Sequence, residues 1–146
     1  MKEVTARDPD YQARVRTSFE KQEAMKTVGA QLVKMSPGEV VIEFPFDHSL
    51  TQQNGYIHAG IITTVVDSAC GYAAYTLMPA DSDVLSIEFK VNFMSPAKGE
   101  TFRAIGRVMK SGRTITVCSG DVVAIENGRE TFVATMQATM ICLVNN

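Results

Sequence analysis

The sequence has few residues of the kinds that bind metals or form disulfides, with two histidines and three cysteines among 146 residues. Cys70, Cys118 and Cys142 are far apart, odd in number and set among apolar neighbours. Neither a zinc site nor a disulfide framework has such spacing. We therefore expect no metal, and we interpret the cysteines as small buried side chains in a reducing compartment.

Long apolar runs and a large net charge are absent as well. The sequence contains no run of about 18 apolar residues, the length that a membrane-spanning helix needs. It also lacks a positively charged start followed by an apolar run, which is the pattern of a secretory signal. The formal net charge of -2 gives no reason to expect nucleic acid or an anionic membrane as a partner. The sequence thus favours a cytoplasmic protein, and its 45% hydrophobic content suffices for a folded core.

Residues 55–77 contain the strongest helical pattern, which ends before Pro79. Apolar side chains recur there at three- and four-residue steps, as in a helix buried on most sides. Gly71 would cost such a helix roughly 1 kcal/mol relative to alanine, so we expect a sheet to pack closely against it. The recurring positions are Ile61, Ile62, Val65, Val66, Ala69, Cys70, Ala73 and Ala74.

Asp67 lies in the middle of this helix and has no basic neighbour in the sequence. Burying an unpaired charge is costly, so the carboxylate needs a reason to be there. It could face a cleft, where carboxylates with shifted pKa values collect. It could also lie on a solvated helix face shared with Thr63, Thr64 and Ser68.

The segments around this helix predict one more helix and six strands. Residues 8–28 begin with Asp8-Pro9, a helix-starting pair, and their sparse apolar positions indicate a peripheral helix that covers an edge or contributes to a lid. The polar residues 47–58 form a loop that leads into the central helix. Short β-prone runs at 31–35 and 39–46 precede that loop, and four long strands with short turns follow from residue 85 to residue 144.

The first long strand shows a regular alternation. Leu85, Ile87 and Phe89 alternate with Ser86 and Glu88, and the pattern continues to Phe93. This spacing predicts a half-buried strand with its apolar residues on one face.

Such elements can bury their apolar faces only if the sheet wraps around the helix. We therefore predict an α+β protein with the hotdog fold, in which an antiparallel sheet surrounds one long helix. The whole of 1–146 would be one domain, with a peripheral N-terminal helix over 1–29 and the hotdog core over 30–146.

The loop and the helix also carry a motif, N-G-x-x-H-A-G over residues 54–60 followed by Asp67. It resembles the N-G-x-x-H-G-G and helical-acid pattern of PaaI-type hotdog acyl-CoA thioesterases. M-S-P-A at 94–97 and K-x-G-R at 110–113 are similar to that family too. The resemblance, over roughly 31–143, implies a cofactor-free hydrolase that converts an acyl-CoA to free acid and CoA.

The resemblance implies roles for six residues near the reacting carbonyl. The backbone N–H of Ala59 would bind the developing oxyanion at the helix N-terminus, beside Gly60. Asp67 would either activate water or attack the carbonyl directly. His58 would shape the oxyanion site or only cap the helix. Two further residues complete the set: Gln52, where the family often has asparagine, and Ser86, which would hold the attacking water or merely face solvent.

His58 and Asp67 are nine residues apart, which is about 13.5 Å along a helix and about 180° around it. One chain cannot easily aim both at one carbonyl, so we expect the site to form between two subunits of an obligate dimer. The family resemblance agrees with this and adds a homotetramer built as a dimer of dimers.

Substrate contacts outside the reacting centre are expected from two places. Asn54 and Gly55 belong to the loop motif. At the turn after residue 110, Lys110, Gly112 and Arg113 are candidates to bind CoA phosphates, although an ordinary polar hairpin would look the same.

The acyl group would run beside the central helix, where Tyr72 or Tyr75 could bound its length or recognise an aromatic group. Two alternative functions are open at this point. One is a non-catalytic acyl-CoA-binding or sensing protein, in line with Ala59 and Gln52. The other is a hotdog hydratase or dehydratase of hydroxyacyl thioesters, which would pair a histidine with an acid.

Overall fold

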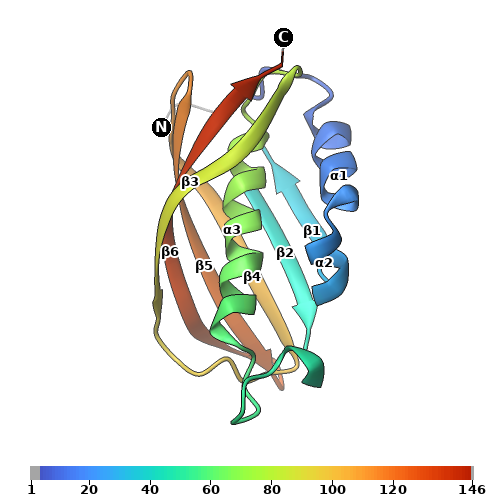
Figure 1. Ribbon diagram of the computed structural model, residues 1–146, viewed down its shortest axis with the longest axis vertical. Coiled ribbons are helices and arrows are strands. Elements are labelled where there is room, and N and C mark those ends of the chain that lie inside the picture. Colours follow the sequence, from blue (N-terminus) through green and yellow to red (C-terminus); the bar gives the residue numbers. More distant parts are fainter. Residues whose placement is uncertain (1–3, 146) are drawn as a thin grey trace.

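A six-stranded antiparallel sheet curls around one long helix, α3 (Ala59–Tyr75), in the computed structural model of the protein (Figure 1). The structure describes residues 4–145, so residues 1–3 and 146 of the predicted domain lie outside the described part. The strand order is β1-β2-β4-β5-β6-β3. This arrangement confirms the hotdog fold. The strands are β1 (Gln31–Ser36), β2 (Glu39–Pro45), β3 (Ser82–Phe93), β4 (Thr101–Ser111), β5 (Ile115–Glu126) and β6 (Arg129–Val144).

The helix and the sheet approach each other closely at two glycines of the sheet. Gly106 on β4 pairs with Gly120 on β5 beneath α3. A Cβ on Gly106 would contact the backbone of Ala69, and one on Gly120 would lie 2.6 Å from a methyl group of Val66. Gly71 has no such neighbour, because nothing lies within 4 Å of the place its Cβ would take. The prediction that the sheet packs against Gly71 was therefore wrong.

The predicted N-terminal helix is present as two helices, α1 (Tyr11–Lys21) and α2 (Glu23–Val28). They are separated at Gln22, whose backbone is extended. Val15 and Met25 are almost fully buried, so this segment contributes to the core and does more than cover an edge. None of the helices within residues 4–145 is long and apolar enough to cross a membrane.

An arginine fastens α1 to the C-terminal end of α3. The Arg14 guanidinium donates to the carbonyl oxygens of Tyr75 (3.1 Å) and Met78 (3.0 Å), and it lies 4.2 Å from the centre of the Tyr75 ring. Asp8 accepts from Arg14 at 2.9 Å. Asp8 is therefore an ion-pair partner here, and Asp10 takes the capping position that the sequence pattern assigned to Asp8.

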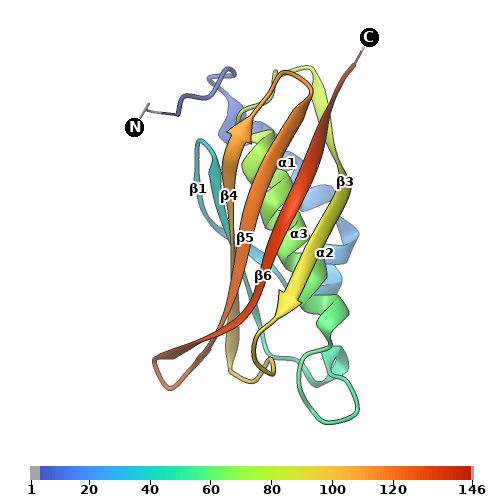
Figure 2. The same ribbon diagram turned by 90° about the vertical axis from the view of Figure 1, so that its left-hand side faces the viewer.

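Strand β3 forms a free edge of the sheet beyond β6, and a bulge interrupts it between Ser86 and Glu88 (Figure 2). Residues that pair directly across antiparallel strands share a face. Ser86 pairs with the fully buried Met140, so its side chain is on the α3 side of the sheet. Simple alternation had placed it on the polar side. The bulge adds one residue and shifts the alternation beyond it.

The bulge also explains why β3 is not half-buried as predicted. Leu85 and Ile87 are 56% and 53% exposed. Phe89 and Phe93 pair with buried residues of β6, yet both are also exposed because no element within residues 4–145 covers the β3 edge. An apolar edge strand of this length is a surface suited to pairing with another chain.

Candidate active site

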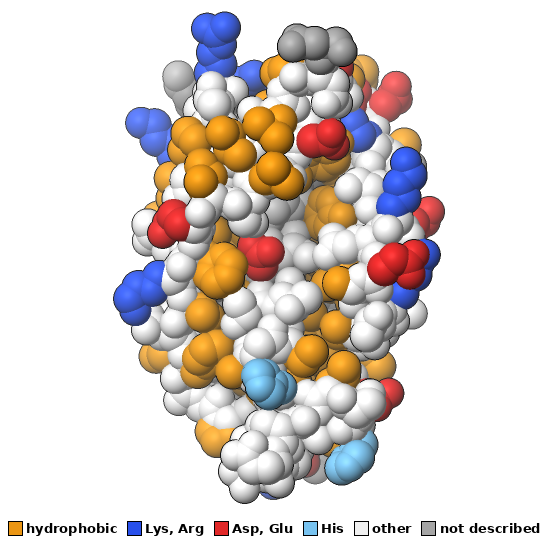
Figure 3. Space-filling view, viewed as in Figure 1, with side chains coloured by type: hydrophobic (Ala, Val, Ile, Leu, Met, Phe, Trp, Pro, Cys, Tyr) orange, Lys and Arg blue, Asp and Glu red, His pale blue; other side chains and the backbone are white. Residues whose placement is uncertain are grey.

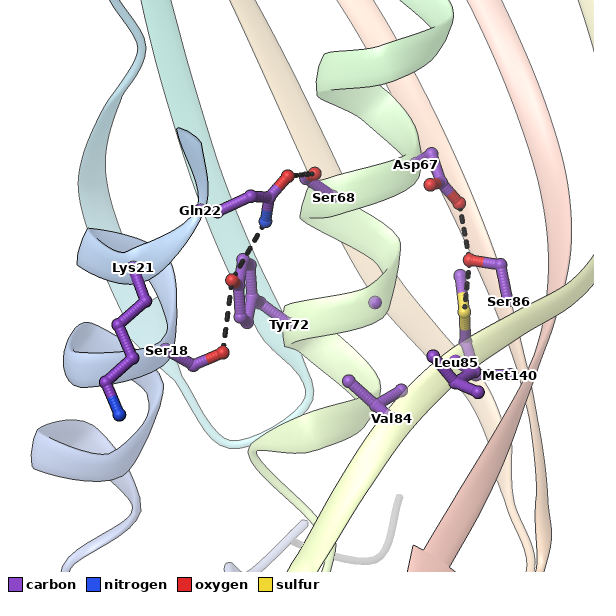
Figure 4. Close-up of a pocket in the computed structure, with 11 residues that line it drawn as sticks. Ser18, Lys21, Gln22, Asp67, Ser68, Tyr72, Val84, Leu85, Ser86 and Met140 are labelled. Carbon is purple, nitrogen blue, oxygen red and sulfur yellow. Dashed lines mark hydrogen bonds between the residues drawn. The ribbon is translucent and has the colours of Figure 1, made fainter. Parts of the chain in front are cut away.

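A cavity of about 510 Å³ lies between α1, α3 and β3, beside Asp67 (Figure 4). Figure 3 shows that the surface is hollowed on this side of the molecule, with apolar side chains along both margins. The cavity is lined by Ser18, Lys21, Gln22, Asp67, Ser68, Gly71, Tyr72, Val84, Leu85, Ser86 and Met140.

Asp67 and Ser86 meet at the β3 side of this cavity. The Ser86 hydroxyl donates to Oδ1 of Asp67 at 2.7 Å, and it also lies 3.3 Å from the sulfur of Met140. Burial raises the pKa of Asp67 above its ordinary value, and the hydrogen bond from Ser86 offsets only part of that effect. No ion pair within residues 4–145 includes Asp67. The result is a desolvated carboxylate in a cavity wall, which is a stronger base than a solvated one.

The other residues of the proposed solvated helix face do not surround Asp67 with water. Ser68 is buried, and its hydroxyl donates to Oε1 of Gln22 at 2.9 Å. The hydroxyls of Thr63 and Thr64 donate to the carbonyl oxygens one turn earlier in α3. The cleft interpretation of Asp67 therefore agrees with the structure better than the solvated-face interpretation.

The N-terminus of α3 has one backbone N–H left for a ligand. His58 is the N-cap residue, and its Nδ1 accepts from the N–H of Gly60 at 2.8 Å. Nδ1 must then be unprotonated, so a neutral His58 carries its hydrogen on Nε2. The N–H of Ala59 has no hydrogen-bond partner within residues 4–145. Ala59 has a helical backbone without positive φ, so alanine is unstrained where the related pattern has glycine.

His58 and Ala59 line a second cavity of about 500 Å³, together with Gln52. The Oε1 atom of Gln52 accepts from the backbone N–H of Asn54, so its amide oxygen helps to shape the loop. Gly55 has a φ of 84° at the tip of this turn, a conformation that favours glycine. Asn54 and Gly55 are exposed and line none of the cavities described here.

The two cavities have no lining residue in common. Asp67 and Ser86 lie in one, whereas His58 and Ala59 lie in the other. A single chain thus holds the two halves of the expected site apart.

The 110–113 turn lies at the end of the molecule opposite to the 47–58 loop (Figures 1 and 2). The N–H of Gly112 donates to the carbonyl oxygen of Ile115 at 2.8 Å, and a Cβ on Gly112 would lie 2.5 Å from that oxygen. Glycine is required by this tight turn. Lys110 and Arg113 belong to this turn and are exposed.

The structure separates the two tyrosines of α3. Tyr72 lines the cavity of Asp67. Tyr75 instead contacts Arg14, and its hydroxyl donates to the carbonyl oxygen of Ser82 at 2.9 Å. Sequence reasoning missed Ser18, Lys21 and Gln22 as lining residues, because they precede Asp67 by more than 40 positions and carry no motif.

The cysteines are buried and take no part in either cavity. Burial raises the pKa of the Cys118 thiol to about 12, and it raises that of Cys70 as well. These thiols are protonated at neutral pH and are poor nucleophiles.

The sheet around one acid-bearing helix, with a loop at the helix N-terminus, defines the hotdog class of proteins. The profile of the thioesterase superfamily matches residues 54–131. A solved structure of a thioesterase family protein from Silicibacter pomeroyi has a TM-score of 0.92 and 48% sequence identity, over 92% of this chain and 99% of that chain. The chain therefore belongs to the thioesterase superfamily.

More distant relatives agree with this assignment. Acyl-coenzyme A thioesterase 13 of Homo sapiens is 30% identical over 99 residues, which are 67% of this chain and 70% of that protein. A protein of Saccharolobus solfataricus is 32% identical over 92 residues, and the match spans 63% of this chain and 65% of that relative. The PaaI protein of the Escherichia coli phenylacetic acid degradation operon shares the fold, with a TM-score of 0.82 at 15% identity over 94% and 95% of the two chains.

Proposed function

We propose that this protein hydrolyses an acyl-CoA thioester to a free acid and CoA, in an active site shared between two subunits. The observation that carries the proposal is the partly desolvated carboxylate of Asp67 in a cavity wall, bonded to Ser86 and without a positively charged partner among residues 4–145. Membership of the thioesterase superfamily and the likeness to a protein named acyl-coenzyme A thioesterase support the same reaction.

In this reaction Asp67 takes a proton from a water molecule, and the water oxygen bonds to the carbonyl carbon of the thioester. Negative charge moves onto the carbonyl oxygen, which accepts a hydrogen bond from the Ala59 N–H. The carbon–sulfur bond then breaks, and the departing CoA thiolate takes up the proton from Asp67. Ser86 orients the carboxylate or the water. Attack by Asp67 itself, followed by hydrolysis of the anhydride, would use the same contacts.

The separation of the two halves within one chain supports the proposal of a shared site. Asp67 and Ala59 line separate cavities of one chain, so a second copy is needed to bring a carboxylate to an Ala59 N–H. The uncovered apolar edge of β3, with Leu85, Ile87 and Phe89, is the surface that would pair. If β3 of one subunit pairs with β3 of a second subunit about a two-fold axis, the two strands run antiparallel. Each end of one subunit then lies beside the opposite end of the other.

The same symmetry would bring the exposed turn of one subunit toward the loop of its partner. Lys110 and Arg113 would then lie near the 54–55 turn across the dimer, where they could bind CoA phosphates. Gln52 would support the loop through its bond to the Asn54 N–H. We also propose that two dimers associate, and light scattering would distinguish a dimer from a tetramer.

The hydratase alternative is less consistent with the geometry. Nδ1 of His58 is engaged with the Gly60 N–H, and His58 lies in a different cavity from Asp67. A shared site would bring His58 near the partner's carboxylate, so the engaged Nδ1 is the feature that makes His58 a poor proton carrier. In the dimer, His58 would contribute a polarising Nε2–H to the oxyanion site.

Thiol release from acyl-CoA esters of different length tests the function, with Asp67→Asn beside the wild type. We expect turnover by the wild type and a loss of about 100- to 10,000-fold in kcat for the variant, as for the removal of a general base. A wild type that binds esters without turnover would indicate a binding or sensing protein.

Ala59→Pro tests the oxyanion donor separately, because proline removes the N–H and little else. Proline is favoured at the first position of a helix. The backbone of His58, with φ -59° and ψ 137°, already has the conformation preferred before proline. We expect a folded protein with kcat lowered by about 100- to 1000-fold. Full activity of this variant would exclude the Ala59 N–H as the oxyanion donor.

A further inference from the structure

The cavity beside Asp67 differs between its two sides. On the α1 side, four polar side chains are joined by hydrogen bonds (Figure 4). On the β3 side, Val84, Leu85 and Met140 accompany Asp67 and Ser86. The four joined residues are Ser18, Gln22, Ser68 and Tyr72.

Gly71 leaves open space between these two sides. It lies one helical turn after Asp67 and lines the same cavity, and nothing is within 4 Å of the place its Cβ would take. A larger residue at this position would fill part of the cavity. The space therefore continues from the carboxylate of Asp67 across α3 toward α1, and an acyl group attached at the Asp67 end would reach the polar side.

The polar side has spare hydrogen-bond donors. Gln22 accepts from Ser68 at 2.9 Å, and one of its two Nε2 hydrogens is donated to the Tyr72 hydroxyl at 2.9 Å. Tyr72 and Ser18 share one hydrogen bond of 3.2 Å. Whichever of these two hydroxyls donates, the other keeps its hydrogen. One hydroxyl hydrogen and one Nε2 hydrogen are thus unused within residues 4–145, so this side suits a ligand oxygen that accepts.

Lys21 adds a positive charge to the same side. It lines the cavity with Ser18, and no ion pair within the described residues includes it. Asp67 is the other charged residue of the lining, and Lys21 does not contribute to its raised pKa, so the two are not partners. Figure 4 shows that the Lys21 side chain extends along α1 toward Ser18 and away from Gln22. A hydroxyl donor and an ammonium group at that end of the polar side favour an anionic oxygen over a neutral one.

We propose that the acyl group of the substrate ends in a carboxylate, bound by Lys21 and by the spare hydroxyl hydrogen of Ser18 or Tyr72. The substrate would then be the CoA thioester of a dicarboxylic acid. This inference rests on the proposed function, because it takes Asp67 as the reacting end of the cavity. A spacer of several methylenes would lie over Gly71 and keep the substrate carboxylate away from Asp67.

Adipoyl-CoA and hexanoyl-CoA test the proposal, because both have six acyl carbons and only the first has a terminal carboxylate. We expect kcat/KM of the wild type to be higher for adipoyl-CoA after subtraction of the uncatalysed rate. In Lys21→Met the value for adipoyl-CoA should fall by about 10- to 100-fold, the range for a hydrogen bond to a charged group. The value for hexanoyl-CoA should be unchanged.

Lys26→Met is the control, since it removes another exposed charge, on α2, that does not line the cavity. It should leave both substrates unaffected. Equal kcat/KM of the wild type for the two esters would overturn the proposal. So would an equal loss for both esters in Lys21→Met, which would place Lys21 against the CoA part.

If the wild type turns over neither ester, calorimetric binding separates the two proposals. Tighter binding of adipoyl-CoA that Lys21→Met abolishes would keep the acyl assignment and reject hydrolysis. Equal or absent binding of both esters would reject the acyl assignment as well.

Discussion

Asp67 has the properties of a residue retained for chemistry at a cost to stability. Its carboxylate is desolvated, its pKa is raised, and the hydroxyl of Ser86 is its hydrogen-bond donor within residues 4–145. Asp67 is half-buried, and a partly desolvated charge without a countercharge within residues 4–145 weakens the folded state. The same desolvation makes the carboxylate a better base, so activity and stability have opposite requirements at this position.

Asp67→Asn should therefore unfold at a higher temperature than the wild type at pH 7. The folded state holds its proton on Asp67 more tightly than the unfolded state, so wild-type stability falls as pH rises from the ordinary aspartate value of about 3.9 to the raised one. The Asp67→Asn variant has no carboxyl group at this position, so its stability does not fall in this way as the pH rises. Thermal unfolding of both proteins between pH 3 and pH 8 would measure a gap that closes toward low pH.

Asp47→Asn provides a control of opposite sign. Asp47 accepts from the hydroxyl and the N–H of Ser49, and these bonds hold its pKa below the ordinary value. Its stabilisation is present above the ordinary pKa and is lost as pH falls through the lowered one. A gap for Asp67→Asn that widened toward low pH would contradict the assigned shift.

At the scale of elements, the position of α3 depends on the glycine pair of β4 and β5. Gly106 lies against the backbone of Ala69, which cannot move aside as a flexible side chain could. Gly106→Ala should thus destabilise the protein by about 1–3 kcal/mol through overpacking. Chemical denaturation of the variant and the wild type would measure the difference.

Gly71→Ala is the matched control, because it makes the same change where the Cβ meets open space. Alanine is a better helix former than glycine by about 1 kcal/mol, so this variant should be more stable than the wild type. Equal effects of the two variants would refute the packing difference between the two positions.

The bulge in β3 decides which residues of that strand reach the active site. It places Ser86 on the same side of the sheet as Met140 and within 2.7 Å of Asp67. The sequence pattern does not reveal the bulge, because Ile87, the additional residue in the bulge, is apolar as the regular alternation expects. Pairing with β6 sets the register of β3, and the sequence of β3 alone does not.

At the scale of the whole molecule, the proposed active site requires two chains. Equal amounts of Asp67→Ala and His58→Ala chains, unfolded and refolded together, should regain activity that neither has alone. Half of the dimers would be mixed, and each mixed dimer would have one intact site of its two. We expect about a quarter of the wild-type activity. Thiol release after mixing measures it.

Pairing along β3 can be tested in the same system. Ile87→Lys adds a charge to the exposed edge, so it should yield monomers in light scattering and prevent the recovery. Val33→Lys, at an exposed position of the opposite edge strand β1, should leave the dimer intact. Mixed dimers that form and stay inactive would place each active site within one chain.

Most of the element order, the candidate loop and the central helix could be predicted from the sequence. Local patterns carry this information: the three- and four-residue spacing of α3, the turn residues between strands, and the N-G-x-x-H-A-G motif before Asp67. These features depend on residues close together in the chain, so hydrophobic periodicity and backbone preferences are enough to predict them.

The surroundings of Asp67 could not be predicted from local patterns. The break at Gln22, the bulge beside Ser86 and the open space over Gly71 arise from packing between segments far apart in the sequence. Tyr72 and Tyr75 look alike in the sequence, and their different surroundings follow from where α1 lies against α3. Contacts of this kind leave no local pattern in the sequence, because the residues that contact each other are far apart in the chain.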